Sequence, residues 1–170
     1  SEGGSIGGIS ASGAGGSQPI VPSPPGNCAA VCVSSVHLVV GGLQSGELFS
    51  GSFEACRNDE CYRSAAFEAG EGGNVKNLAE SFADPSVRLA YYEEGASFDL
   101  DLEWSWWAPP RLTDGDRYTL RWIEPAGIAT TLIDTPVSYE PRTLCGSSCL
   151  TAYLPNLERP IEAVGGAGAD

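Results

Sequence analysis

The residue types best suited to chemistry in this sequence are six cysteines, which fall into three close pairs. The pairs are Cys28 and Cys32, Cys56 and Cys61, and Cys145 and Cys149. Structural zinc sites normally show C-x2-C spacings or histidine ligands, whereas these pairs enclose three or four residues and the chain has one histidine. An even number of cysteines without metal-ligand spacing predicts disulfides and an oxidising compartment.

The second pair belongs to the best-specified hairpin in the sequence. Apolar and polar residues alternate up to Cys56 and again after Cys61, with a four-residue loop between the two cysteines. Pairing across this loop places Cys56 opposite Cys61 and Glu54 opposite Arg63, so a covalent bond and an ion pair agree on one register. We therefore predict a Cys56–Cys61 disulfide.

The other four cysteines have two pairing schemes. We predict Cys28–Cys32 and Cys145–Cys149, and each bond must close over a turn because four residues of extended strand span about 13 Å. The competing scheme ties one end of the chain to the other. It would stabilise the fold more, since it closes a longer loop.

Residues for acid–base catalysis are scarce. His37 lies within the apolar run Val31–Val40, which predicts a strand buried on both faces and a hydrogen-bonded structural histidine. The sequence has no Gly-x-Ser-x-Gly elbow, no His-Glu-x-x-His motif and no glycine-rich loop before a helix. Asp99 and Asp101 alternate with apolar residues, which is typical of a solvated strand face rather than a glycosidase pair. We predict no enzymatic activity and no organic cofactor.

A polar loop offers one candidate metal site. Asp114 and Asp116 flank Gly115 there, and carboxylates on such a loop suit calcium, which prefers oxygen ligands. The alternative is a simple Asp-Gly turn, which we favour because the sequence supplies no third placed ligand.

The four tryptophans suggest a platform for sugar rings, but alternation assigns three of them to the core. Trp104 and Trp106 share a face with Leu102, and Trp122 shares one with Leu120. Trp107 points outward beside two prolines, where it would contact a sugar or a protein partner. The alternative for Trp107, which we favour, is a cap on the end of the fold.

Charge and composition exclude other classes of partner. The formal net charge of −13 opposes nucleic-acid binding, which needs a basic surface. No apolar run approaches the roughly 18 residues that a membrane span requires. The chain begins at Ser1 and lacks methionine, so we expect a processed, extracellular product whose signal peptide has been removed.

Residues 1–26 differ from the rest of the chain. Eighteen of these 26 residues are Gly, Ser or Pro, and Glu2 is their only charge. Such a segment is either a flexible tether or a thin donor strand for a neighbouring subunit. Small residues alternate within it, which favours the donor. The residues expected to fill the acceptor groove are Ile6, Ile9, Ala11, Ile20 and Val21.

The remaining sequence predicts an all-β domain at residues 27–164 and a tail at 165–170. Seven to nine short strands with a turn about every ten residues indicate a disulfide-stapled, immunoglobulin-like two-sheet sandwich. One or two helical turns are expected at 74–83, and a last strand at Leu144–Leu154.

These features predict a non-enzymatic extracellular structural protein. Its N-terminal segment would insert into a neighbouring copy, head to tail, and so build a surface filament or pilus-like fibre. The alternatives are a tethered surface lipoprotein and a β-sandwich module that binds a carbohydrate or another partner.

Overall fold

The computed structural model describes residues 31–44, 50–68 and 82–160. Its strands are β1 (Ser34–Gln44), β2 (Ser50–Arg57), β3 (Glu60–Arg63), β4 (Phe67–Glu68), β5 (Val87–Glu94), β6 (Ser97–Trp106), β7 (Asp116–Ile123), β8 (Ala129–Val137), β9 (Glu140–Leu144) and β10 (Ser147–Leu157). The donor segment at 1–26, residues 74–81 of the expected helix and the tail at 165–170 lie outside the described residues.

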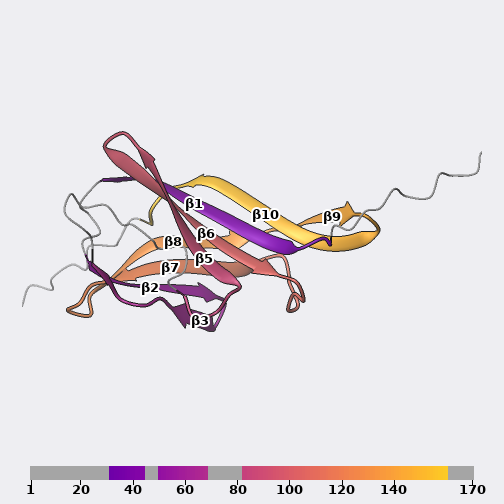
Figure 1. Ribbon diagram of the computed structural model, residues 1–170, viewed down its shortest axis with the longest axis horizontal. Coiled ribbons are helices and arrows are strands. Elements are labelled where there is room, and N and C mark those ends of the chain that lie inside the picture. Colours follow the sequence, from indigo (N-terminus) through magenta and orange to yellow (C-terminus); the bar gives the residue numbers. More distant parts are fainter. Residues whose placement is uncertain (1–30, 45–49, 69–81, 161–170) are drawn as a thin grey trace, which may run out of the picture.

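The strands form two sheets, which confirms an all-β, sandwich-like arrangement. Sheet 1 has the order β5-β6-β1-β10-β9, and sheet 2 has the order β3-β2-β7-β8, with β4 also paired to β2. Figure 1 shows β1 and β10 side by side in one layer and β2, β7 and β8 in the other. The first and last described strands are therefore neighbours at the centre of sheet 1, and they run parallel.

The core lies between the sheets and follows the predicted alternation. On β6, the inward residues Leu102 and Trp104 are fully or almost fully buried, as predicted. The Trp104 ring meets Tyr118 of β7 and Tyr62 of β3, with ring centroids 5.8 and 5.6 Å apart. These contacts join the inner faces of the two sheets, since β6 belongs to one sheet and β3 and β7 to the other.

The first strand differs from its prediction. We expected Val31–Val40 to be buried on both faces, but β1 begins at Ser34 and only alternate residues are buried. Val36 and Leu38 face the core, whereas His37 and the other residues on the same face of the strand are partly exposed. The strand is so apolar because β6 and β10 flank it on both sides and partly shield its outer residues.

The C-terminal region forms a hairpin rather than the single strand predicted at Leu144–Leu154. Cys145 and Gly146 both have positive φ, 54° and 79°, as a tight two-residue hairpin turn requires. The arm before the turn, β9, contains Pro141. β9 is an edge strand, where a proline is tolerated because one side of the strand needs no ladder hydrogen bonds.

Candidate functional site

The predicted hairpin is present in the predicted register. Cys56 is bonded to Cys61, and Glu54 lies opposite Arg63. The carboxylate of Glu54, however, pairs with Arg121 on β7, whose Nη2 is 3.3 Å from Oε1. β2 lies between β3 and β7, and Arg121 is the β7 residue directly opposite Glu54.

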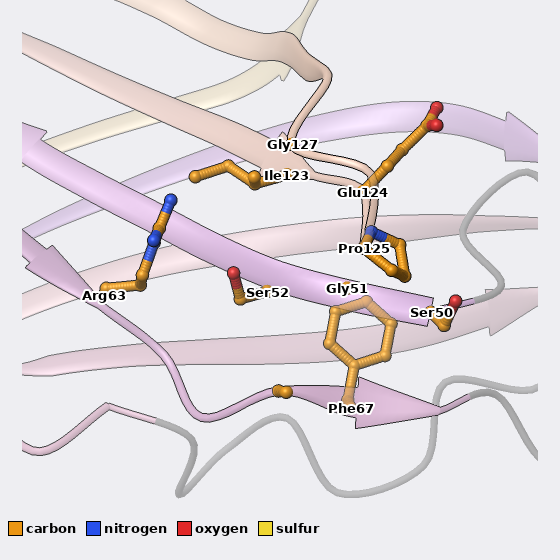
Figure 2. Close-up of a pocket in the computed structure, with 10 residues that line it drawn as sticks. Ser50, Gly51, Ser52, Arg63, Phe67, Ile123, Glu124, Pro125 and Gly127 are labelled. Carbon is orange, nitrogen blue, oxygen red and sulfur yellow. The ribbon is translucent and has the colours of Figure 1, made fainter.

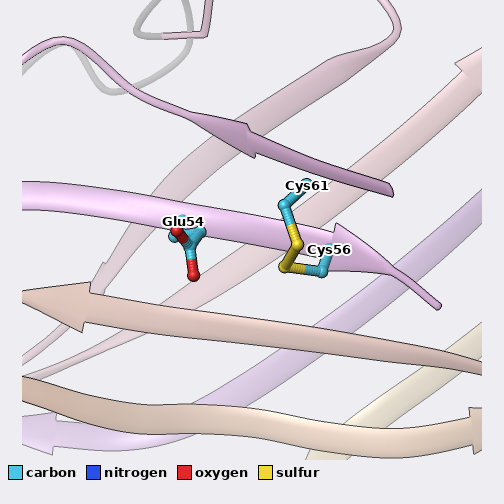
Figure 3. A group of neighbouring side chains, drawn as sticks. All are labelled: Glu54, Cys56 and Cys61. Atoms are coloured by element: carbon cyan, nitrogen blue, oxygen red, sulfur yellow. A yellow bond between two sulfur atoms is a disulfide. The ribbon is translucent and has the colours of Figure 1, made fainter. Parts of the chain in front are cut away.

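The same three side chains have the composition of a metal site. Ligand atoms of Glu54, Cys56 and Cys61 lie within 4.8 Å of one another. Figure 3 shows the two sulfur atoms joined, with Glu54 beside them. Because a disulfide leaves no thiolate to bind a metal, this cluster is a covalent staple.

The second described disulfide corrects our pairing scheme. Cys32 is bonded to Cys149, 117 residues away along the chain, so the predicted Cys28–Cys32 and Cys145–Cys149 bonds are wrong. Cys145 is also disulfide-bonded, whereas Cys28 lies outside the described residues. β10 returns beside β1 in parallel, and this places Cys149 against the entry to β1.

Asp116, one of the two predicted calcium ligands, is the centre of a buried polar network. Both it and Arg57 are only 7% exposed. Arg57 donates from Nε and Nη2 to Asp116 Oδ2 at 3.0 and 2.7 Å. Asn58 donates to Oδ1 at 3.0 Å, and the Tyr139 hydroxyl donates to Oδ2 at 2.9 Å. Burial alone would raise the pKa of Asp116, but hydrogen bonds from Asn58 and Arg57 outweigh it and lower the pKa.

This network supports the turn interpretation of the Asp114–Asp116 loop. Asp114 Oδ1 accepts a hydrogen bond from the Tyr139 backbone N–H at 2.8 Å. The Arg57 guanidinium already neutralises the negative charge of the Asp116 carboxylate. A metal cation would therefore have to displace Arg57. Sequence reasoning missed Arg57 and Tyr139, because neither is near the loop in the sequence.

His37 lies on the outer face of sheet 1. Its Nδ1 is 3.4 Å from Asp101 Oδ2, and its ring meets Tyr153 edge-on, with centroids 6.4 Å apart. The hydrogen bond to Asp101 raises the pKa of His37, although partial burial opposes this shift. A histidine that is hydrogen-bonded on a sheet face fits the predicted structural role.

A pocket of about 470 Å³ opens where β2 begins, between β4 and the β7–β8 turn. Figure 2 shows the Phe67 ring beside β2 at Gly51, and Arg63 on the neighbouring strand. Phe67 stacks on Phe53 of the core, with centroids 5.1 Å apart. Among the described residues, its lining offers the hydroxyls of Ser50 and Ser52, the Arg63 guanidinium and the Glu124 carboxylate, but no imidazole and no thiol.

Comparisons with protein-family models, with curated proteins and with solved structures found no match. Within the described residues, no helix has the length and apolar character needed to span a membrane.

The tryptophans are placed largely as alternation predicts. Trp104 is buried, and Trp122 is partly buried and donates from Nε1 to the Ser50 carbonyl at 3.0 Å. Trp107 is 76% exposed. It borders a cleft of about 230 Å³ together with Trp106 and residues of the segment before β5. The expected donor residues Ile6, Ile9, Ala11, Ile20 and Val21 lie outside the described residues.

Proposed function

We propose that this protein is a non-enzymatic structural subunit of an extracellular filament, in which the N-terminal segment adds as a strand to a neighbouring copy. The observation that carries this proposal is the Cys32–Cys149 bond. It fastens the point where the N-terminal segment enters the body to the last strand of the fold.

This bond changes how the fold would carry tension. Any pull on residues before Cys32 reaches β10 through a covalent bond, and not only through the hydrogen bonds of β1. Since β1 and β10 are central strands of sheet 1, the load enters the middle of a five-stranded sheet instead of peeling an edge. Such an attachment suits a subunit joined to its neighbours through that segment.

The remaining support concerns location and fold. The disulfides indicate an oxidising environment, and an extracellular one is part of the proposal. An immunoglobulin-like arrangement is also part of it, supported by two packed sheets of short and mostly antiparallel strands. The buried network around Asp116 stabilises the body, and no step of the proposal needs catalysis.

The proposal is tested by electron microscopy and light scattering of the purified full-length protein and of a variant that lacks residues 1–18. We expect filaments from the full-length chain and monomers from the shortened one. Identical assemblies from both would contradict strand addition. A full-length monomer would favour the tethered-lipoprotein alternative.

A second candidate function is binding of a carbohydrate or another partner through Trp107. Its support is the high exposure of this ring beside the cleft formed with Trp106. A glycan array would test it, with Trp107→Ala as the variant. Equal glycan binding by the variant, or no binding by the wild type, would dismiss the carbohydrate function.

A further inference from the structure

We infer that the acceptor for the donor strand is the outer edge of β5, a more specific statement that depends on the proposed function. Among the described strands, β5 and β9 form the edges of sheet 1, and β8 and β3, the latter together with the two-residue β4, form those of sheet 2. An edge strand presents unpaired N–H and C=O groups, so each of the four edges is a potential acceptor.

Three of the four edges carry features that hinder strand addition. β9 contains Pro141, and β8 contains Pro136 and a bulge opposite the Leu120–Arg121 step. β3 is only four residues long. Prolines, bulges and short length are the usual protections of natural sheet edges. β5 has none of them, since it pairs with β6 from Val87 to Glu94 without a register shift.

The hydrogen-bonding groups on the outer side of β5 can be assigned. Ser105 donates to the Ser86 carbonyl at 2.8 Å, which makes these two residues a hydrogen-bonded pair. In an antiparallel ladder, such pairs alternate with pairs whose backbone groups point away. Leu89, Tyr91 and Glu93 therefore direct their N–H and C=O groups away from β6. Among the described residues, no backbone partner meets these groups.

The side chains of β5 also suit a thin, uncharged strand. Leu89 is fully buried, and Tyr91 packs against Phe98 with ring centroids 5.0 Å apart. An added strand would continue this apolar inner face. Ile9 and Ala11 share one parity in the donor sequence and would lie on that face, while the intervening serine would face water.

The occupant is the segment of a second copy, and not the chain's own segment. β1 and β5 are two strands apart, which is about 10 Å. Cys32 is fixed to β10, and the residues between Ala14 and Cys32 include four prolines, so as a stiff extended linker they would span about 55 Å. A linker of this kind would carry the donor past its own β5 to that of a neighbour.

The test compares Glu93→Pro with Glu93→Ala in the full-length protein. Both variants lose the same side chain, but only proline removes an outward N–H and thereby a hydrogen bond to the donor. We expect Glu93→Pro to raise the concentration needed for assembly by about tenfold, with Glu93→Ala close to wild type. Circular dichroism should show the same fold in both variants.

Hydrogen exchange on the wild type tests the same edge without any substitution. Amides of Leu89, Tyr91 and Glu93 should gain protection on assembly, whereas those of β9 should not. Three results would overturn the β5 assignment without refuting strand addition itself. They are unchanged assembly of Glu93→Pro, an equal loss of assembly in Glu93→Pro and Glu93→Ala, and protection of the β9 amides on assembly. A wild type that never assembles would instead refute the proposed function, and the β5 assignment would fall with it.

Discussion

Arg57 and Asp116 form a buried ion pair that joins β2 to β7, with Nη2 2.7 Å from Oδ2. The two residues are 59 positions apart in the sequence. The Arg57 guanidinium also donates to the Arg111 carbonyl, so it fastens the loop before β7 as well. Charges that are this buried are tolerated only when both partners and their hydrogen bonds are in place.

Removing one partner of this pair should therefore be costly. Arg57→Met should lower the free energy of unfolding by about 3–5 kcal/mol, because it leaves an uncompensated buried carboxylate. The matched control is Arg117→Met, since Arg117 is 63% exposed and pairs with Asp134. That change should leave the free energy of unfolding close to the wild-type value, because water screens an exposed ion pair. Urea denaturation measures both, and equal losses would contradict the assigned role of burial.

The same pair predicts sensitivity to acid. Since the folded-state pKa of Asp116 is lowered, its stabilising contribution is present above the unfolded pKa near 4 and is lost as the pH falls through the folded value. Asp116→Asn should flatten the decline in stability below about pH 4. Denaturation curves recorded between pH 2 and 7 would test this, and an unchanged slope in the variant would count against it.

The pKa of His37 can be measured by NMR, and it reports on the contacts made on the outer face of sheet 1. As the chain has one histidine, its imidazole NMR signals need no assignment. We expect a pKa above the ordinary 6.5, and a lower one in Asp101→Asn. Glu103→Gln should lower it less, because Glu103 acts only through its charge.

The pKa of His37 also sets the sign of its effect on stability. A raised folded-state pKa means that the contribution is fully present below pH 6.5 and is lost as the pH rises through the folded value. If the wild type titrates at or below 6.5, the Asp101 contact is not made in solution.

The two described disulfides should differ in their effect on stability. Replacing Cys32 and Cys149 by serine should cost up to about 5 kcal/mol, because that bond closes a loop of more than 100 residues. Replacing Cys56 and Cys61 should cost only about 2 kcal/mol. Thermal and urea unfolding would compare the two double variants. A larger loss from the hairpin bond would contradict the loop-entropy explanation.

Gly51 is the glycine whose replacement should be most harmful among the described ones. Its φ is 137°, and a Cβ would lie 2.2 Å from the Ile123 carbonyl oxygen. Gly95 also has a positive φ, 66°, but nothing lies within 4 Å of its Cβ position. Gly51→Ala should therefore cost at least about 2 kcal/mol more than Gly95→Ala in the free energy of unfolding.

Local patterns in the sequence determined the individual strands and one staple. The alternation from Phe98 to Trp106 sets which face of β6 is buried, because successive side chains of a strand point to opposite sides, and only Trp106 at its end is partly exposed. The short separation of Cys56 and Cys61 sets the hairpin register, although the predicted four-residue loop is a two-residue turn because Arg57 pairs with Glu60. Trp107 is exposed as predicted, but it lies one residue beyond the end of β6, where strand parity no longer determines its direction.

Only the tertiary structure decided which strands are neighbours, and that choice determines every long-range contact. Cys149 meets Cys32 because β10 lies beside β1, and no feature near either cysteine shows this. Arg57 reaches Asp116, and Arg121 rather than Arg63 pairs with Glu54, because β7 lies beside β2. Alternation specifies the buried face of a strand but not its partner, since many sheet orders bury the same faces. The order is decided by the joint packing of both sheets over one core.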